Sequence, residues 1–397
     1  MKAAEDFERD PFLFLDRALA GGAGEAIRLP LGELCLTDAA ASRAVLANAD
    51  GLYQEHSDFF HTRRGDFGPR ALQVELGRSA MKVLYARLHE RAAGLPALLE
   101  RELAPASGWP DAGNWLIYRH LEAALVAPSR PARLRRRAEQ IVERAVLSGA
   151  RERHSLLGRA IFRFQALREL AAEIERDRRA RAGRPEVEPQ DVIGVLASAA
   201  RPEIAGREVP AKELAEIFLS FLFAVSGSIG FTLGWSLHLL GLHPEKAGLP
   251  PAWVVREALR LHPVAWLMGR RPARPHRMAG EQVTPKDEVV VCPYAVHRNP
   301  RHWEDPAEFR PERFAQGGDE SAFLPFGWGP HKCVGASFSL RLVEDVLRLL
   351  LERWQLRVEP TGGRSPVGAA LAPPPFALHL QTRPSERKST DGSCERG

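Results

Sequence analysis

The 397-residue sequence is poor in cysteine and tyrosine, with four of each. The cysteines, Cys35, Cys292, Cys333 and Cys394, are too few and too scattered for a disulfide framework, which indicates a reducing compartment. No stretch reaches the roughly 18 uninterrupted apolar residues of a membrane span. The N-terminal residues MKAAEDFERDPF are charged and lack the apolar core of a signal peptide. These absences predict a cytoplasmic protein without a membrane anchor.

The sequence also lacks a strong charge imbalance, since 55 basic and 50 acidic residues leave a net charge of +5. Arginines gather in residues 130–145 (RPARLRRRAEQIVERA), but acids are interleaved and no nucleic-acid motif accompanies them. We therefore expect a solvated helix face and no nucleic-acid partner. No dinucleotide fingerprint, phosphate loop or Ser–His–Asp nucleophile elbow is present, which excludes the enzyme classes that these motifs define.

The composition favours a globular, helix-rich chain, because 45% of the residues are hydrophobic and helix formers recur throughout. No repeat or linker divides the sequence, so we expect one mainly α domain over residues 1–397, with residues 383–397 as a disordered tail. Strand-like segments at 26–37 and 288–297, and a hairpin near Gly362-Gly363, predict a minor β region.

One predicted helix stands apart from the others. Residues 211–241 are apolar nearly all round, so this helix must lie in the core of a large domain. Gly227 and Gly230 lie near its middle, where each glycine costs about 1 kcal/mol relative to alanine. We expect either close helix packing or a ligand pressed against that face.

The strongest chemical signal is the segment FLPFGWGPHKCVGASFSL, residues 323–340. Cys333 lies between a turn-rich loop and an amphipathic helix pattern. A thiolate at a helix N-terminus is stabilised by the helix dipole and by free backbone amides, and the neighbouring Lys332 adds positive charge. Cys333 is therefore a candidate metal ligand, although a lone cysteine is more often a small buried hydrophobe.

This loop resembles the haem-binding signature of the cytochrome P450 family. The matching positions are Phe326, Gly327, Gly329, His331, Cys333 and Gly335. The resemblance implies that Cys333 is the axial ligand of a haem b iron, and that the other five positions form the cofactor-binding loop around it.

Two upstream segments resemble further motifs of the same family. Glu257 and Arg260 (EALR) lie one helical turn apart, and Arg313 follows in PERF. The resemblance implies that these three residues form a structural triad beneath the haem. It also implies that Arg271 and His331 bind the haem propionates, to which the forked arginine side chain is well suited.

The resemblance implies a single triangular, mainly α domain with a minor β region, acting as a monooxygenase. Its substrate would be a small or medium hydrophobic organic molecule, free or carrier-bound, of bacterial specialised metabolism. Without a flavin or nicotinamide motif, NADH or NADPH would act only through separate partners, a ferredoxin and its reductase. Basic residues near Cys333 that could dock an acidic ferredoxin are Lys332, Arg341, Lys82 and Arg87. We expect a monomer that binds no membrane.

The central helix departs from the family pattern, in which an acid followed by threonine relays protons. In FLFAVSGSIGFTLGW, Gly227 stands at the acid and Ser228 at the threonine. The hydroxyl survives and the carboxylate is missing, which leaves proton delivery to Ser228 with water or to a substrate hydroxyl. Two alternatives stay open: another reaction on the same fold (oxidative coupling, dehydration or rearrangement), and non-catalytic haem-based binding or sensing.

The substrate pocket is predicted only from the position of residues relative to these motifs. Its candidate lining residues are largely apolar. They are Val225, Ser226, Val264, Ala265, Trp266, Leu267 and Phe376. The remaining histidines, among them His56, His61 and His297, have no metal-ligand spacing along the sequence, and we expect ordinary surface or packing roles for them.

Overall fold

The computed structural model describes residues 5, 7, 9–22, 24–147, 154–182, 184, 187–199, 209–315, 320–368 and 370–382. Most of them are helical. The α-helices are α2 (Pro11–Ala20), α3 (Ala39–Ala47), α4 (Arg70–Arg91), α5 (Leu95–Leu103), α6 (Asp111–Leu125), α7 (Ala132–Ile141), α8 (Leu156–Arg181), α9 (Val192–Ala199), α11 (Ala211–Leu222), α12 (Ile229–Leu242), α13 (Pro251–Leu261), α14 (Pro293–Val296) and α15 (Ala336–Arg353). Short 3₁₀ or π turns are η1 (Ala92–Gly94), η2 (Val142–Val146), η3 (Phe223–Ser228), η4 (Pro244–Gly248), η5 (Pro311–Phe314) and η6 (Gly329–His331).

The strands form four small sheets. The largest has the order β1-β2-β9-β6, in which β2 and β9 are parallel and the other pairs antiparallel; a second has the order β10-β11-β5, and β3-β4 and β7-β8 are two-stranded. The strands are β1 (Ala26–Arg28), β2 (Leu34–Leu36), β3 (His61–Thr62), β4 (Gly65–Asp66), β5 (Ala106–Trp109), β6 (Met268–Arg270), β7 (His276–Met278), β8 (Glu281–Val283), β9 (Val289–Val291), β10 (Trp354–Pro360) and β11 (Phe376–Thr382). The predicted mainly α fold with a minor β region is confirmed.

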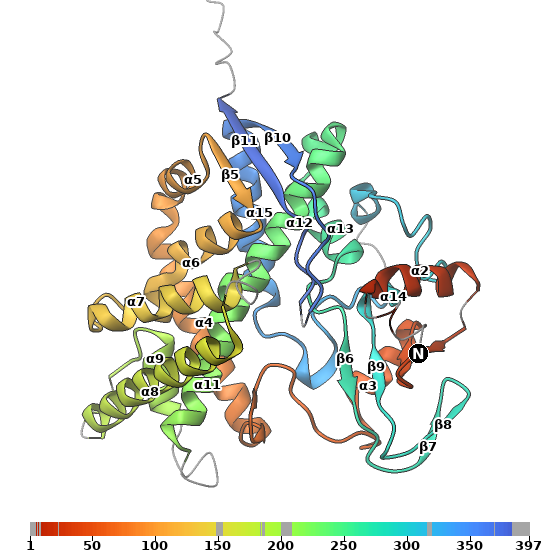
Figure 1. Ribbon diagram of the computed structural model, residues 1–397, viewed down its shortest axis with the longest axis horizontal. Helices are drawn as coiled ribbons and strands as arrows, with labels where there is room; N and C mark the ends of the chain where they lie inside the picture. The colour runs from red at the N-terminus through yellow and green to blue at the C-terminus, as the bar shows by residue number, and fades with distance from the viewer. Residues whose placement is uncertain are drawn as a thin grey trace, which may run out of the picture.

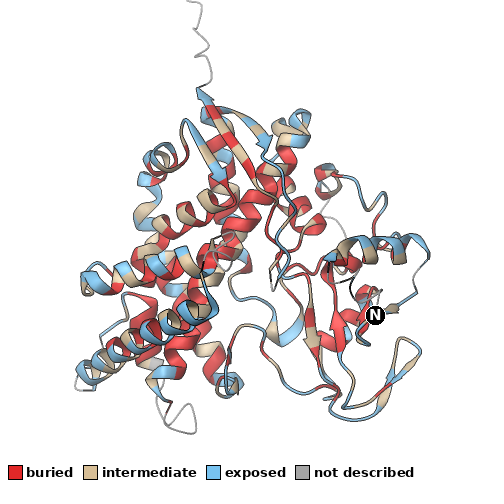
Figure 2. Cartoon of the chain, viewed as in Figure 1, coloured by how far each residue is buried: buried red, intermediate tan, exposed pale blue. Residues whose placement is uncertain are grey.

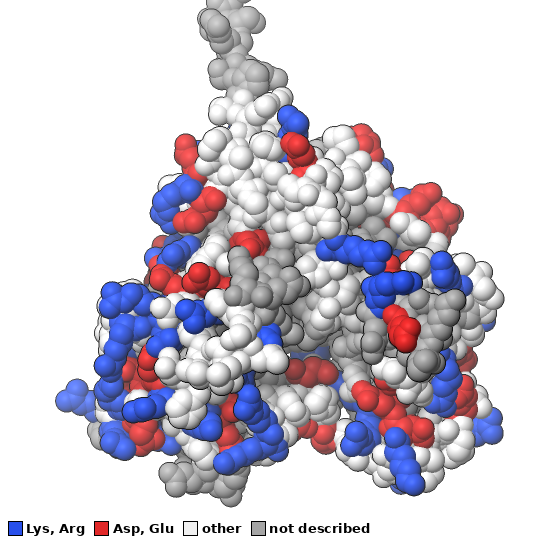
Figure 3. Space-filling view, viewed as in Figure 1, with Lys and Arg blue, Asp and Glu red and all other residues white. Residues whose placement is uncertain are grey.

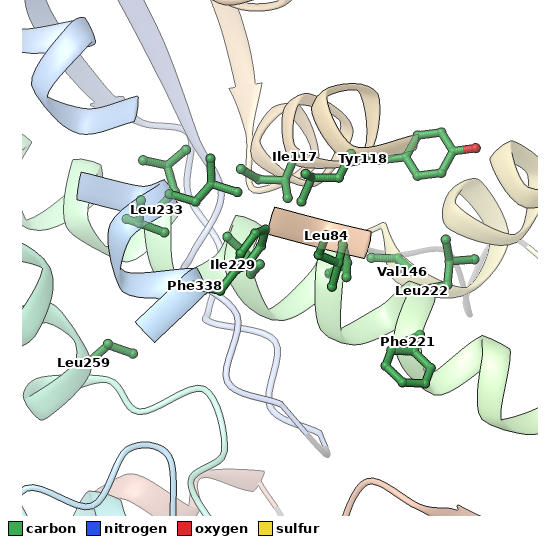
Figure 4. Packing of buried hydrophobic residues seen from close by; sticks show 14 of the residues in the cluster. Leu84, Ile117, Tyr118, Val146, Phe221, Leu222, Ile229, Leu233, Leu259 and Phe338 are labelled. Carbon is green, nitrogen blue, oxygen red and sulfur yellow. The ribbon is translucent and has the colours of Figure 1, made fainter. Parts of the chain in front are cut away.

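The molecule has a triangular outline, with α5 to α9 on one side and the β6–β9 sheet with α2 and α3 on the other (Figure 1). The helix pair α11 and α12 runs through the middle. Buried positions concentrate along this axis (Figure 2). Side chains from α4, α6 and α15 converge on it, including Leu84, Ile117 and Phe338 (Figure 4).

The predicted central helix is present as one rod, residues 211–242, but a π-helical turn interrupts it at Phe223–Ser228. By length and composition alone the rod could cross a membrane, although Ser, Thr, Gly and His interrupt its apolar residues. Its most apolar 18-residue window is 72% buried, which accounts for apolar residues on every side. The prediction that this helix lies in the core is confirmed.

Four further expectations from the sequence concern a strand-like run, the arginine-rich segment, the C-terminal tail and the number of domains. The strand-like run 288–297 ends at Val291, because Pro293 begins helix α14. The arginine-rich segment forms α7 and η2 on a surface where acids alternate with the bases (Figure 3). Arg137, for example, binds Glu169 with N–O distances of 2.7 and 2.9 Å. The predicted tail, 383–397, lies outside the described residues. The single domain stays a prediction, in keeping with a main core that extends from Leu15 to Leu380.

Candidate functional site

The loop before α15 places Cys333 at the start of that helix. Its backbone turns back on itself, since the Cys333 amide donates to the Phe326 carbonyl at 2.9 Å. Gly327 and Gly329 both have φ of +69°, a left-handed conformation that side chains disfavour. At position 329 a Cβ would also come within 2.8 Å of the Ala47 Cα, so only glycine lets the loop pack on α3. The glycine spacing therefore sets the position of the cysteine.

The Cys333 side chain is accessible, unlike those of Cys35 and Cys292, which are buried. Burial of the sulfur among loop atoms raises the pKa of the Cys333 thiol, while a hydrogen bond from the Gly335 amide and the charge of Lys332 lower it. The residue as a whole is exposed, while its sulfur is surrounded by protein atoms. A Cβ at Gly335 would contact this sulfur at 3.8 Å. The glycine thus leaves the approach to the sulfur open.

Two basic side chains lie close to this loop. His331 is largely covered, with Nδ1 3.3 Å from Arg70 Nη1 and Nε2 3.0 Å from a Glu55 carboxylate oxygen. Arg270, at the end of β6, is buried and donates to both Asp58 carboxylate oxygens at 3.0 and 2.8 Å. Both His331 and Arg270 line one small hollow of about 20 Å³.

The residue predicted to bind a propionate beside His331 was Arg271, and its side chain is exposed. Only its backbone carbonyl takes part in the site, accepting from the Gln54 amide at 2.9 Å. Successive residues of a strand point to opposite faces, so Arg270 turns inward where Arg271 cannot. We therefore replace Arg271 by Arg270 as the proposed propionate-binding arginine.

The donor set fits a haem with a thiolate ligand. A cysteine sulfur that accepts a backbone amide hydrogen bond suits an axial metal ligand. The bidentate hold of Arg270 on Asp58 shows that its guanidinium is oriented to take a carboxylate, which is the chemical group of a propionate.

The predicted triad is brought together and lies deep in the protein. Glu257 and Arg260 are both 0% exposed, and two hydrogen bonds of 2.7 and 2.8 Å join them. Arg260 uses its three other N–H groups on backbone carbonyls, so all five donors of the guanidinium have acceptors. These carbonyls belong to His297, Pro306 and Glu308, at 2.8, 2.7 and 2.9 Å.

Glu257 also binds the segment that precedes the cysteine loop. One of its oxygens accepts from the Arg310 amide at 2.8 Å and from Arg313 Nε at 3.1 Å. Arg313 in turn donates to the Glu304 carbonyl at 3.0 Å. A fully hydrogen-bonded network of this kind fixes the chain that leads into the Cys333 loop.

His297 forms a joint between this network and the cysteine loop, a role that the sequence did not reveal. Its Nδ1 lies 3.0 Å from the Arg260 carbonyl, and its Nε2 accepts from the Leu324 amide at 2.8 Å. Accepting at Nε2 requires a neutral ring with its proton on Nδ1. Burial, with the nearby Arg260 charge, accordingly lowers the pKa of His297 to about 3.

The π turn of the central helix is held by a residue from another helix. Asn114 of α6 donates from Nδ2 to the carbonyls of Ser226 and Gly227 at 2.9 and 3.2 Å. None of the described residues hydrogen-bonds Asn114 Oδ1, which is buried. Gly230 makes this crossing possible, because a Cβ there would lie 2.6 Å from Asn114 Nδ2 and 2.9 Å from its backbone. The expected close helix packing is thus present.

Gly227 itself faces apolar side chains. A Cβ at this position would lie 3.0 Å from the Phe223 ring and 3.3 Å from Val146. A carboxylate there would need both neighbours to move and would be surrounded by hydrocarbon. The apolar packing around position 227 is therefore suited to glycine and unsuited to an acidic side chain. Ser228, the next residue, is half-buried and ends the π turn.

The predicted substrate residues separate into two groups. Trp266 and Leu267 line a hollow of about 470 Å³, together with His56, Asp58, His61 and Gly368. The Trp266 indole N–H donates to the Gly368 carbonyl at 2.9 Å, which fixes that wall.

The others lie away from that lining. Phe376 is 1% exposed and stacks on Trp109, with ring centroids 5.6 Å apart, because it begins a strand paired with β5. Ser226 is buried and donates to the Leu222 carbonyl of its own helix. Both are dropped as pocket residues.

The last three predicted pocket residues differ in exposure. Val225 and Val264 are buried in hydrophobic clusters, and Ala265 is exposed. None of them lines the hollow of about 470 Å³.

Comparison with known proteins points to one family. A family model described as cytochrome P450 matches residues 252–379, which contain the triad and Cys333. The solved structure of open cytochrome P450 EryK from S. erythraea superposes with a TM-score of 0.70, at 19% identity, over 95% of this chain and 97% of that one. CYP109E1 from Bacillus megaterium in complex with corticosterone gives a TM-score of 0.73 at 18% identity, over 93% and 98%.

Two curated relatives come from Streptomyces. Cyclooctat-9-en-7-ol 5-monooxygenase of Streptomyces melanosporofaciens is 31% identical over 49% of this chain and 47% of its own length. Pentalenene oxygenase of Streptomyces avermitilis is 27% identical over 55% and 53%. The aligned region thus spans about half the length of these relatives. Residues 252–379 thus match the cytochrome P450 family, and the fold is that of the family, whose cofactor is a haem b ligated by a cysteine thiolate.

Proposed function

We propose that this protein is a haem-thiolate monooxygenase that oxidises a small or medium hydrophobic molecule in bacterial specialised metabolism. The observation that carries the proposal is Cys333, an exposed residue set by its glycine loop at the start of α15, whose sulfur accepts a hydrogen bond from the Gly335 amide. The two Streptomyces relatives, named for oxidation of cyclooctat-9-en-7-ol and pentalenene, support both the reaction and the substrate class.

The chain's own residues have separable tasks in this proposal. When bound, the haem supplies the oxygen chemistry. Cys333 holds the iron as a thiolate, which the Gly335 amide and Lys332 stabilise against the effect of burial. Arg270 and His331 bind the propionates. Ser228 offers the one hydroxyl at the acid–alcohol position, and a proton there is held at its Oγ, by water or by a hydroxyl of the substrate.

The proposed substrate site is the hollow of about 470 Å³. Pockets of roughly 300–1,000 Å³ hold small and medium organic ligands. Trp266 and Leu267 give it an apolar wall, while Asp58 and the two histidines make the opposite part polar. A hydrophobic molecule with at least one polar group suits this lining, whether it arrives free or on a carrier.

Electrons are proposed to come from NADH or NADPH through a reductase and a ferredoxin. Lys332, beside the cysteine, is an exposed cation on which an acidic partner could dock, whereas Lys82 on α4 is exposed but lies 3.0 Å from a Glu188 carboxylate oxygen. Arg341 and Arg87 are likewise less available than Lys332, because Arg341 faces Asp345 at 3.7 Å and Arg87 binds Glu90. We further propose a cytoplasmic monomer that binds neither nucleic acid nor membrane.

A second candidate keeps the fold and changes the reaction to oxidative coupling, dehydration or rearrangement. The observation in its favour is Gly227, since the acid that ordinarily relays protons is missing there and a side chain would fit only if Phe223 and Val146 shifted. Reactions that need no such relay would not be slowed by its absence.

The test starts with the ligand and then turns to the reaction. The reduced, carbon-monoxide-bound protein should show the red-shifted Soret band of thiolate ligation, and Cys333→Ala should lose it while Cys292→Ala keeps it. With ferredoxin and reductase, wild type should consume NADH or NADPH and insert oxygen into product. A thiolate spectrum without oxygen insertion would favour the second candidate, and an unchanged band in Cys333→Ala would overturn both.

A further inference from the structure

Two histidines and an aspartate meet at the β3–β4 hairpin, next to the proposed propionate-binding residues, since His56 also lines the small hollow of His331 and Arg270. His61 and Asp66 are paired across the two strands, so their side chains lie next to each other. His56 reaches the same point from the preceding loop. Asp66 Oδ1 lies 3.1 Å from His56 Nδ1 and 3.1 Å from His61 Nδ1. The ligand atoms of all three lie within 4.8 Å of one another.

The geometry points to a divalent metal site of the zinc class, with His56 Nδ1, His61 Nδ1 and Asp66 Oδ1 as ligands. Zinc binds imidazole nitrogen and carboxylate oxygen at about 2.0–2.2 Å, so ligand atoms at neighbouring tetrahedral corners stand about 3.3 Å apart. The two His–Asp separations of 3.1 Å already match that spacing. The ligand atoms of the two histidines lie within 4.8 Å of each other, and this separation must shorten to about 3.3 Å when an ion binds.

The surroundings supply the support that metal-binding histidines usually have. His56 Nε2 faces Asp58 Oδ1 at 3.7 Å, which resembles a carboxylate–histidine–metal arrangement. Arg270 holds Asp58 in place through both carboxylate oxygens. The Ser57 amide, at 3.3 Å, donates to Asp66 Oδ1 and helps to fix its direction.

The site is open to ions and adjoins the substrate hollow. The side chains of His56, His61 and Asp66 are 35%, 50% and 28% exposed. Both histidines line the hollow of about 470 Å³. Because three protein ligands leave a tetrahedral ion with one free coordination position, water or a donor atom of a molecule in the hollow can complete it.

The same distances suit a cluster without metal, in which both imidazoles donate to one carboxylate oxygen. Metal binding replaces the two Nδ1 protons, so the two arrangements differ in composition and are separable by measurement. The experiment uses the haem-loaded full-length protein, treated with a chelator and desalted. It is then titrated with zinc chloride by calorimetry, and bound zinc is counted against haem iron by elemental analysis.

Wild type should bind one zinc per chain with a micromolar or tighter dissociation constant. His61→Ala and Asp66→Asn should weaken this binding by well over tenfold, and Asp58→Asn by about 10–100-fold, as for other outer-shell carboxylates. His379→Ala is the matched control, since this partly exposed histidine lies 3.5 Å from Glu359 on another sheet. It should bind zinc as wild type does.

Zinc affinity and stoichiometry unchanged in His61→Ala and Asp66→Asn would overturn the site. So would millimolar binding alone, which would mean an adventitious ion only. Circular dichroism spectra and melting curves of the variants guard against misfolding, and the exposed position of His61 makes that variant the safer of the two. Because bound zinc is the readout, the result is independent of whether the protein is a monooxygenase.

Discussion

Replacing Glu257 by glutamine should strongly destabilise the protein although the side chain keeps its shape. The carboxylate accepts four hydrogen bonds, two from Arg260, one from the Arg310 amide and one from Arg313. Glutamine has one acceptor oxygen, and its amide group would face the N–H groups of a guanidinium. The Arg260 charge, 0% exposed, would lose its counter-ion and could not reach water.

Removing one partner of a buried ion pair costs about 3–5 kcal/mol, because the other charge is left uncompensated. A domain is stable by only about 5–15 kcal/mol, so Glu257→Gln should give little haem-loaded protein and a large drop in the urea midpoint. Urea unfolding followed by circular dichroism and by the Soret band measures both. Asp345→Asn is the control, since its i,i+3 pair with Arg348 is 39% and 48% exposed and should lose at most about 1 kcal/mol.

A glutamine variant within about 1 kcal/mol of wild type, with full haem content, would refute the reasoning, because that is the value of an exposed pair. Replacing both partners, with Glu257→Gln and Arg260→Met, should cost less than the sum of the two single losses. The difference measures their coupling directly. The double variant should still be less stable than wild type, since the three carbonyls bound by Arg260 would lose their donors.

Three other predictions concern separate parts of the molecule. The pKa of His297 is about 3 in the folded protein, against 6.5 for an ordinary histidine, so the unfolded chain takes up a proton first as pH falls. The free energy of unfolding should therefore drop by about 1.4 kcal/mol per pH unit below about pH 6.5, or roughly 2 kcal/mol at pH 5. In His297→Gln the slope of this pH dependence should be shallower by about one proton. Gly230→Ala should lower the free energy of unfolding in urea by about 1–3 kcal/mol or more, because the Asn114 backbone lies 2.9 Å from the added Cβ. Gly94→Ala is the control and should cost nothing, since no atom lies within 4 Å of its Cβ. Equal losses in the two variants would contradict the close packing of α6 against α12 at Gly230. Ser228→Ala should reduce product formed per NADH consumed by well under tenfold, because a hydroxyl without an acid partner is a poor relay; a collapse of coupling with peroxide release would show that Ser228 is the relay.

The triad and the role of the cysteine loop were predicted from the resemblance to family motifs, and local geometry explains only part of them, since Arg313 reaches Glu257 from 56 residues away. Glu257 and Arg260 are one turn apart on a single helix, so their contact depends on helical geometry alone. The cysteine loop is likewise a short segment whose glycines fix its shape. The all-round apolar pattern of residues 211–242 predicted burial, and burial is what the rod shows.

Features that depend on distant parts of the chain were not predictable. Asn114 donates to the carbonyls of Ser226 and Gly227, which lie more than one hundred residues later in the sequence, and no pattern in either segment predicts this contact. The choice between Arg270 and Arg271 depended on the register of a three-residue strand, where a shift of one position exchanges the faces. Trp266, Met268 and Arg270 alternate along the chain and are all buried. This alternation would have favoured Arg270, but only if the inward-facing side of the strand had been known.

The position of the 211–242 rod along the chain has a consequence for synthesis on the ribosome. When this apolar segment emerges, α6, α8 and α9 have already been translated, and the rod contacts all three. Nascent hydrophobic surface invites aggregation or capture by the membrane-insertion machinery unless a partner covers it. The earlier helices can therefore shelter the rod at once, and α13 and α15, which arrive later, cover the sides that remain. The order of the helices thus lets a segment with the composition of a membrane span mature inside a globular core.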